Sequence, residues 1–281
     1  MMSDENHTKT GSRAVSARRI TAVDGGFEAR DEGCDVAVEA PLTIDIGDLD
    51  SFTLLCTPNG DEDAMTVGFL FSEGVIESTD QIESMRACLD DERVVRVQLS
   101  EGAPPAHGEG RNLLIVSSCG MCGSESIDDK VARMGRVGDT LRVPVASLWS
   151  VQRSMRQRQV LFERCGGTHA AGIFDAGGNI LSFAEDIGRH NALDKAIGRC
   201  LIDGRQTAGM GAALSGRVSL EMVGKAARAG IELIAAVSAP TSLALDAAEH
   251  CGITLCAFVR ETRATVFAGP PRVVEPAPET S

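Results

Sequence analysis

Two cysteines that lie two residues apart give the strongest chemical signal in the sequence. Cys119 and Cys122 belong to the segment CGMCG, whose glycines remove side-chain bulk around both sulfurs. A thiol on such an adaptable backbone can enter first one protein's site and then another's, as a carrier of sulfur must. The thiolate is the reactive form, so positive charge near the pair is needed to lower the thiol pKa. Acidic side chains follow instead, at Glu125, Asp128 and Asp129. The activating charge must therefore come from the fold or from a partner.

A zinc site is the main alternative for these thiols. Cys165 and His169, in the segment CGGTH, would complete a set of four ligands with Cys119 and Cys122. The gap between the two halves exceeds the usual spacing of small zinc modules, and a chain of this size can fold without a metal. A thioredoxin-like dithiol would open a helix, which two glycines disfavour. Two hypotheses stay open: a sulfur carrier without a metal, which we favour, and a non-enzymatic, zinc-stabilised binding module.

Polar side chains are dense in the segment EDIGRHNALDK, which follows a predicted strand. Arg189 and His190 lie next to Gly188 at the turn from this strand into a helix. In an open α/β sheet this is the edge at which ligands bind, so we expect both to contact a ligand. His169 follows two glycines in another turn, where a ligand could approach closely. For Asp194 and Lys195, further along the helix, a solvated helix face is the expected role.

Two arginines follow the last long predicted strand, in the segment FVRETR. Arg260 and Arg263 could hold phosphate oxygens through bidentate hydrogen bonds. Their spacing fits an exposed turn equally well. Because the chain carries a formal charge of -13, an anionic ligand would have to be held at such local pairs of arginines.

The elements that must position these residues alternate between strand and helix patterns. Alternating apolar residues predict an antiparallel strand pair over 42–46 and 52–56 and another strand over 95–99. Helices are predicted over 63–73 and from Pro144 through Phe162. Beyond Asn179, apolar strands alternate with three helices. This indicates an α/β layer in which a largely parallel sheet is covered on both faces.

Composition sets the domain boundaries and excludes some classes of function. Residues 1–35 and the proline-rich 269–281 are predicted tails, 36–140 an α+β region that carries the cysteine pair, and 141–268 the α/β domain. With 40 acidic against 27 basic side chains, nucleic-acid binding is not expected. The apolar runs are far shorter than the ~20 residues that a bilayer requires, and the N-terminus lacks the apolar region of a secretory signal. We expect a cytoplasmic protein without a membrane span.

Seven segments taken together resemble the FdhD/NarQ family, the formate dehydrogenase accessory sulfurtransferases. Besides CGMCG, five are GGTHAAGIFD (166–175), EDIGRHNALDKAIG (185–198), SGRVSLEMVGKAARAGI (215–231), VSAPTSLALDAA (237–248) and EAPLTI (39–44). The last is MTVGFLFSEGVI (65–76), so the resemblance covers nearly all of the chain between the tails. It implies a cytidine deaminase-like three-layer domain. Deaminase chemistry is not expected, because HAA stands where a zinc deaminase needs H-x-E.

The resemblance also implies a function and a set of partners. Cys119 would accept persulfide sulfur from a cysteine desulfurase, with Cys122 assisting. The sulfur would pass to the metal of Mo-bis(molybdopterin guanine dinucleotide), or its tungsten counterpart, which is needed by the formate dehydrogenase catalytic subunit. This cofactor, bound as a substrate, would contact Arg189, His190, His169 and the segment Phe258, Val259, Arg260, Glu261, Thr262 and Arg263. GDP would bind as a fragment of it, and a homodimer is expected.

Overall fold

The fold has two parts, called layers below, each made of one sheet and the helices that cover it. The first layer is a five-stranded sheet covered by one helix. The structure, a computed structural model, describes residues 11–47, 51–89, 91–100, 112–115 and 127–275. The strand order is β5-β6-β3-β4-β7, built from β3 (Ala40–Asp45), β4 (Ser51–Cys56), β5 (Ile82–Ala87), β6 (Val94–Leu99) and β7 (Asn112–Ile115). As predicted, β3 and β4 pair antiparallel. Their alternate apolar side chains pack against α1 (Glu62–Ser72), and Gly74 beyond it adopts a φ of 77°. A 3-10 helix (Thr79–Gln81) precedes β5.

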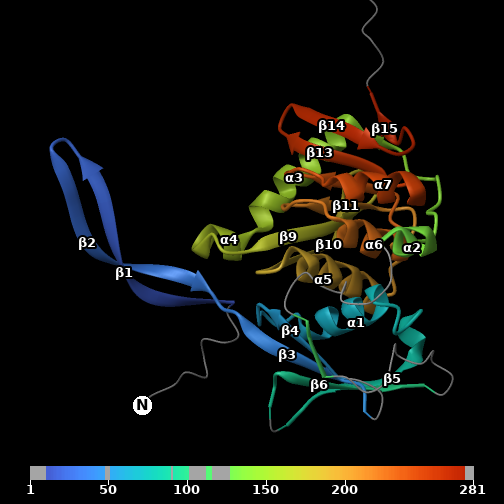
Figure 1. Ribbon diagram of the computed structural model, residues 1–281, viewed down its shortest axis with the longest axis horizontal. Coiled ribbons are helices and arrows are strands. Elements are labelled where there is room, and N and C mark those ends of the chain that lie inside the picture. Colours follow the sequence, from blue (N-terminus) through green and yellow to red (C-terminus); the bar gives the residue numbers. More distant parts are fainter. Residues whose placement is uncertain (1–10, 48–50, 90, 101–111, 116–126, 276–281) are drawn as a thin grey trace, which may run out of the picture.

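A six-stranded mixed sheet forms the second layer (Figure 1). Its order is β10-β9-β11-β12-β13-β14, built from β9 (His169–Phe174), β10 (Ile180–Asp186), β11 (Gly211–Leu214), β12 (Leu233–Ala236), β13 (Thr254–Arg260) and β14 (Arg263–Ala268). The pairs β11–β12 and β12–β13 are parallel, and the other pairs are antiparallel. The expected largely parallel sheet is therefore wrong. Short turns join β9 to β10 and β13 to β14, and such turns can connect only antiparallel strands.

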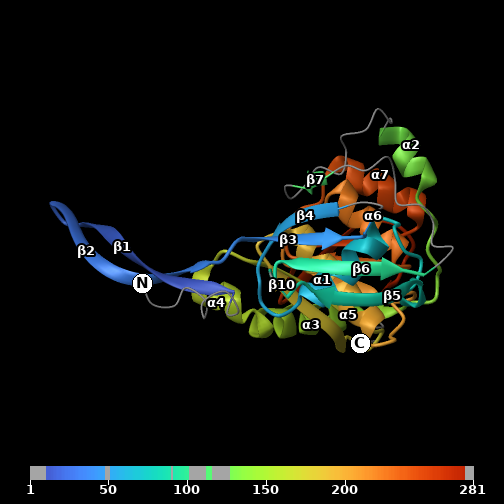
Figure 2. The same cartoon turned by 90° about the horizontal axis from the view of Figure 1, so that it is seen from below.

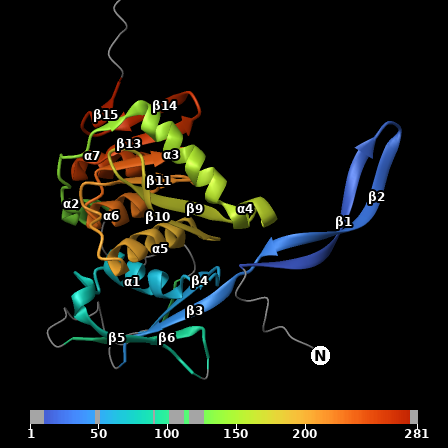
Figure 3. The same cartoon turned by 180° about the vertical axis from the view of Figure 1, so that it is seen from behind.

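Helices cover both faces of the six-stranded sheet, as predicted. On one face lie α5 (Arg189–Ile202), α6 (Leu220–Arg228) and α7 (Ser242–Cys251), and on the other lies α3 (Val145–Arg158) (Figure 3). Successive residues of a strand point to opposite faces. Ala212 accordingly belongs to the core under α5 to α7, and Ala213 belongs to the core under α3.

The helix predicted from Pro144 through Phe162 is two helices. The first, α3, ends at Arg158, and α4 (Val160–Cys165) begins after Gln159, whose ψ is 66°. The carboxylate of Glu185 accepts hydrogen bonds from the backbone N–H groups of Leu161 and Phe162, both at 2.9 Å. These N–H groups are paired with a side chain from a distant strand, which fixes the start of a new helix at this point.

The two layers meet through a close contact between α1 and α5, which lie next to each other in Figures 1 and 2. A Cβ atom at Gly68 would overlap the carbonyl oxygen of Asp194, and one at Gly198 would overlap that of Ala64. Glycine at both positions lets the two backbones touch. This contact sets the position of α5, and α5 begins at a predicted site residue, Arg189.

The expected N-terminal tail of residues 1–35 is wrong from residue 12 onward, because residues 12–37 contain two strands. These residues form a long antiparallel hairpin of β1 (Ser12–Val23) and β2 (Gly26–Ala37), which projects from the two layers in Figures 1 to 3. Every residue from Arg18 to Asp31 is exposed. Because neither face of this part of the hairpin is buried, its sequence lacks the alternation of polar and apolar residues that marks a half-buried strand.

The expected C-terminal tail is also wrong, over residues 269–275. The short strand β15 (Val273–Val274) pairs with β8 (Val143–Pro144). Arg272 is 1% exposed, and its Nε lies 3.1 Å from a carboxylate oxygen of the equally buried Glu232. This ion pair holds the segment in the fold despite its prolines.

The segment before β8 lies against the α/β layer. The helix α2 (Ile127–Arg133) contacts α7, and the N–H of Val137 donates to the carbonyl of Cys251 at 2.9 Å. The domain change at residue 140 stays a prediction. No helix in the described ranges has the length and apolar character that crossing a membrane requires.

Candidate functional site

One edge of the six-stranded sheet gathers most of the predicted site residues. The strands β11, β12 and β13 end at this edge, and β9 begins there because it runs antiparallel to β11. The helices α5 and α6 start close by, at Arg189 and Leu220. The carboxyl ends of parallel strands are where α/β sheets bind ligands, so the arrangement has the geometry of a binding site.

A hollow of about 680 Å³ lies between this edge and the helix α3. Its floor is made by the ends of the strands, at His169, Ser215, Val237 and Val259. Its remaining lining comes from α3, from the start of α4 and the loop after it, and from the end of β13: Trp149, Gln152, Arg153, Arg156, Gln157, Gln159, Phe162, Gly166, Gly167, Thr168, Arg260 and Glu261. The volume lies within the ~300–1,000 Å³ range of small-molecule sites.

The lining of the hollow is positive although Glu163 pairs with Arg156, because Arg153 and Arg260 outnumber Glu261. The Arg260 guanidinium donates to the carbonyls of Val237 at 2.6 Å and Val259 at 3.2 Å, which fixes its direction and leaves further donors free for a ligand. Arg156 lies over the ring of Phe162, 5.1 Å from its centroid. The other two lining charges are Arg153 and Glu261.

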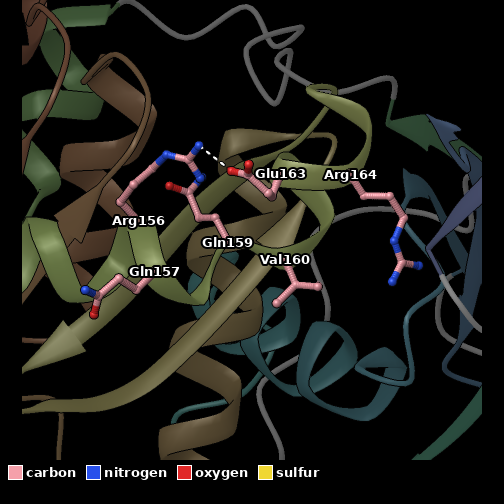
Figure 4. A pocket seen from close by; sticks show the side chains of 6 residues that line it. All are labelled: Arg156, Gln157, Gln159, Val160, Glu163 and Arg164. Carbon is pink, nitrogen blue, oxygen red and sulfur yellow. Dashed lines mark hydrogen bonds and ion pairs between the residues drawn. The ribbon is translucent and has the colours of Figure 1, made fainter. Parts of the chain in front are cut away.

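Arg156 also lines a second hollow, of about 590 Å³, between α3 and α4. Figure 4 shows the Arg156 guanidinium directed at the carboxylate of Glu163, with a nitrogen–oxygen distance of 2.6 Å, whereas Arg164 points away from this pair. Because Glu163 pairs with Arg156, the remaining cation in the lining of this second hollow is Arg164, whereas Arg153 and Arg260 both line the first hollow.

Further positive charge lies next to His169. A Cβ at Gly216 would be 3.2 Å from Nδ1 of His169 and 3.5 Å from Cβ of Arg189, so both residues approach the same glycine. Burial, together with the charges of Arg189 and Arg217, lowers the pKa of His169. Burial and Arg217 also lower the pKa of the Arg189 guanidinium, whose Nε is buried without a partner among the described residues. A buried donor without a partner is costly, and an anionic ligand would satisfy it.

His190 is held in its neutral form beside this cluster. Burial, and then the charge of Arg189, lowers its pKa to about 4. Its Nε2 lies 3.4 Å from the hydroxyl of Ser219 and 3.4 Å from a carboxylate oxygen of Glu221, and that hydroxyl donates to Glu221 at 2.7 Å. At neutral pH the imidazole is therefore a hydrogen-bonding group and not a cation.

The acidic residues of the same segment hold the fold together. Asp186 is fully buried, accepts a hydrogen bond from the N–H of Thr57 at 2.9 Å, and pairs with Lys195 at 2.8 Å. Asp194 pairs with Lys225 of α6 at 2.9 Å. Asp194 and Lys195 are 2% and 1% exposed, so the expected solvated helix face is wrong. The cause is α1, which covers this side of α5.

The segment 258–263 divides between residues that line the hollow and exposed residues outside its lining. Val259, Arg260 and Glu261 line the hollow. Phe258 has a φ of 51° and is 38% exposed, and its ring lies 5.9 Å from that of Phe267. Arg263 is exposed and lies across from Arg260 in the β13–β14 pair, and Thr262 is exposed in the turn between the two strands.

The chain was compared with known proteins, and residues 37–274 match the FdhD/NarQ family. The chain belongs to this family. It is 36% identical over 277 residues to the sulfur carrier protein FdhD of Thermoplasma acidophilum, covering 96% of each chain. It is 37% identical to that of Mycolicibacterium paratuberculosis, covering 93% of this chain and 99% of the relative. A crystal structure from Desulfotalea psychrophila, assigned as a formate dehydrogenase accessory protein, superposes with a TM-score of 0.73 at 26% identity, covering 93% of this chain and 99% of that one.

The cysteines of this FdhD/NarQ chain fall into distinct groups. Cys119 and Cys122 lie outside the described residues, between β7 and α2. Cys56, Cys200, Cys251 and Cys256 are buried, and burial raises the pKa of Cys56 and of Cys256 to about 12 and also raises that of Cys200 and Cys251, whereas Cys88, also expected in the core from its apolar neighbours, is only half-buried. The thiol of Cys165 donates to the carbonyl of Leu161 at 3.0 Å. Within the described ranges, no three His, Cys, Asp or Glu side chains are grouped as a metal site would require.

Several residues of the candidate site were missed by sequence reasoning. Arg153 and Arg156 lie on a helix whose prediction rests on apolar spacing alone, and their contribution to the site depends on how α3 packs over the sheet. Ser215 and Arg217 could have been found, because the segment SGR directly follows the predicted strand that is now β11. Arg189 was singled out because ligands bind at strand ends in α/β sheets, and the same reason applies to the end of this strand.

Proposed function

We propose that this chain is a sulfurtransferase that acts through a persulfide. A cysteine desulfurase persulfide donates its outer sulfur to the Cys119 thiolate, and the desulfurase leaves with its own thiolate restored. Cys122 assists or relays this sulfur. The acceptor is the metal of Mo-bis(molybdopterin guanine dinucleotide), or of its tungsten counterpart, which is bound as a substrate before it enters the formate dehydrogenase catalytic subunit. Membership of a family of sulfur carrier proteins supports the transfer of sulfur in the maturation of formate dehydrogenase.

The observation that carries the acceptor part of the proposal is the arginine-rich hollow at the sheet edge. A pterin dinucleotide carries pyrophosphate groups, and guanidinium groups bind such oxygens with fixed geometry. Arg260 offers free donors inside the hollow. Beside the hollow, the buried Nε of Arg189 has no hydrogen-bond partner among the described residues. The hollow of about 680 Å³ suits one nucleotide-sized part of the substrate. We assign His169, Glu261 and Val259 to contacts with this part, His190 to a neutral hydrogen-bonding role, and Phe258, Thr262 and Arg263 to the outer rim.

The sulfur-carrying step is tested by intact mass spectrometry. After incubation with a cysteine desulfurase and cysteine, the protein should gain the mass of one sulfur, and the Cys119→Ala variant should not. Cys119→Ala should also fail to activate a co-expressed formate dehydrogenase. Cys200→Ala is the matched control, because Cys200 is a buried core thiol and its loss should affect stability alone. Full formate dehydrogenase activity with Cys119→Ala would refute the proposal.

The acceptor site is tested by calorimetric titration with GDP as a fragment of the substrate. Removing one guanidinium that contacts phosphate should weaken binding ~10- to 100-fold, the usual range for a hydrogen bond to a charged group. We expect this loss for Arg189→Ala and Arg260→Ala, and a smaller one for Arg263→Ala at the rim. Arg158→Ala, exposed at the end of α3, is the control. Persulfide loading should stay normal in all four variants. Unchanged GDP affinity in Arg189→Ala and Arg260→Ala would place the acceptor site elsewhere.

Metal analysis separates this proposal from the zinc-stabilised binding module built on Cys119, Cys122, Cys165 and His169. We propose that the purified protein holds no stoichiometric zinc and keeps its stability in the presence of a chelator. One zinc per chain, lost together with stability on chelation, would support the module instead. We also propose that the protein is located in the cytoplasm and that its three-layer α/β part has a cytidine deaminase-like fold.

A further inference from the structure

Arg156 lies where the first and the second hollow meet, because it belongs to the lining of both. Its guanidinium lies over the ring of Phe162, which lines the first hollow, and donates to the carboxylate of Glu163, which lines the second, at 2.6 Å (Figure 4). In an unbroken helix, two residues seven positions apart lie ~10 Å apart along the axis. The break at Gln159 instead allows this direct contact between α3 and α4. A cation of the first hollow is thus held by a carboxylate of the second.

The ion pair between Arg156 and Glu163 is weak, and Arg156 is the member that can move. The two side chains are 52% and 73% exposed. Water solvates both charges when such an exposed pair separates, so breaking the pair changes an equilibrium constant by at most about fivefold. Glu163 lies on α4, whose start is fixed by the hydrogen bonds from Leu161 and Phe162 to Glu185. Arg156 has several rotatable bonds, and exposed side chains of this kind change rotamer rapidly. A competing anion can therefore draw Arg156 away from Glu163.

The competing anion that suits the first hollow is a pyrophosphate. Arg153 and Arg156 are three residues apart on α3 and so share one face of this helix, and both line the hollow together with Arg260. Guanidinium groups donate charge-assisted, often bidentate hydrogen bonds to phosphate oxygens. One such contact usually raises affinity ~10- to 100-fold, which exceeds the cost of separating Arg156 from Glu163. A pyrophosphate group held by Arg153 and Arg260 can therefore recruit Arg156 as a third cation.

We propose that Arg156 is a further substrate-binding residue and that Glu163 restrains it until the substrate binds. When the pyrophosphate enters the first hollow, Arg156 exchanges the carboxylate of Glu163 for phosphate oxygens. Glu163 is then left with water, which its exposed position allows. This inference rests on the proposed function, because the anion is the pyrophosphate of the pterin dinucleotide. Its consequence is that Glu163 lowers the affinity of the acceptor site, so that removing this carboxylate strengthens binding.

Calorimetric titration of the full chain with GDP tests this exchange. Glu163→Gln should bind GDP about two- to fivefold more tightly than wild type, because Arg156 no longer has to leave a carboxylate. Arg156→Ala should bind GDP at least about threefold more weakly, because a phosphate contact is lost and only part of that loss is offset by the ion pair. Glu77→Gln is the matched control, since Glu77 also forms an exposed ion pair with an arginine, at 2.9 Å from Arg228, but does not line the hollow. An equal gain in Glu77→Gln would overturn the proposal, because it would show an effect of net charge alone.

The double variant tests whether Glu163 acts through Arg156. In the Arg156→Ala background, the Glu163→Gln substitution should leave GDP affinity unchanged, because there is no guanidinium to release. A gain as large as that in the wild-type background would show that Glu163 acts only as a nearby negative charge, and would overturn the exchange. Unchanged GDP affinity in both single variants would overturn it as well.

The Arg260→Ala variant separates a failure of this inference from a failure of the proposed function. If Arg260→Ala weakens GDP binding and neither Arg156→Ala nor Glu163→Gln changes it, the acceptor site stands and the role of Arg156 is wrong. If the wild-type protein does not bind GDP, the acceptor site and this inference are both wrong. Persulfide loading should be normal in Arg156→Ala and Glu163→Gln, and a loading defect in both would overturn the assignment of this pair to the acceptor site.

Discussion

At the scale of single residues, His190 links the site to the pH dependence of stability. Its folded-state pKa of about 4 lies below the ordinary value of 6.5 because burial and Arg189 disfavour the charged form. The unfolded chain therefore binds the proton more tightly, and the stability that neutral His190 provides is complete above pH 6.5 and lost as the pH falls toward 4. The loss should be on the order of 3 kcal/mol. Urea unfolding of His190→Gln between pH 7 and 4 should show a shallower decline than wild type. An equally steep decline would mean that other groups cause it.

The buried ion pair of Arg272 and Glu232 supports a second prediction at this scale. Both side chains are 1% exposed, and Glu232 also accepts hydrogen bonds from the N–H groups of Thr140 and Leu141. Arg272→Met leaves a buried carboxylate without its cation, which should cost about 3–5 kcal/mol of unfolding free energy. Arg142→Met removes an exposed ion pair with Asp139 and should cost less than about 1 kcal/mol. Equal effects of the two substitutions in urea unfolding would contradict the anchoring role of Arg272.

At the scale of elements, the contact between α1 and α5 depends on two glycines. Gly198→Ala would place a methyl group on the carbonyl oxygen of Ala64, and a backbone atom cannot move aside as a side chain can. We expect the free energy of unfolding, measured in urea, to fall by about 3 kcal/mol or more. This is at or above the upper end of the usual cost of adding atoms to a well-packed interior. Gly135→Ala is the control, since no atom lies within 4 Å of the added Cβ. A Gly198→Ala protein of normal stability would mean that the helices can separate without cost.

At the scale of the whole molecule, the two layers should unfold together. Backbone contact between α1 and α5, the hydrogen bond from Thr57 to Asp186, and the ion pair of Lys225 with Glu73 all cross between them. Trp149 is the single tryptophan and lies on α3, so its fluorescence reports on the α/β layer alone, whereas far-ultraviolet circular dichroism reports on both layers. The two urea transitions should coincide. Separate midpoints would show that the layers are independent domains, as the predicted change near residue 140 implies.

The local elements and the family could be read from the sequence because they rest on short-range patterns. The strands β3, β4 and β6 and the helices α1, α5, α6 and α7 follow from periods of two and of about 3.6 residues. The turn that carries Arg189 and His190 follows from the boundary between such patterns. Seven ordered segments were specific enough to indicate the FdhD/NarQ family, which the match over residues 37–274 confirms.

The strand order and the partners of charged groups were decided only in the tertiary structure. The strands β9 and β14, which pair antiparallel with their neighbours, were not predicted from the sequence. A two-residue period is in any case the same for parallel and antiparallel pairing. Lysine and arginine usually lie at the surface, but Lys195 and Arg272 are buried. Each forms an ion pair with a buried carboxylate, Asp186 for Lys195 and Glu232 for Arg272, and only the folded chain brings these partners together. The hollow at the sheet edge arises in the same way. Its arginines come from α3 and β13, about 100 residues apart, and long-range packing of the helix on the sheet brings them together.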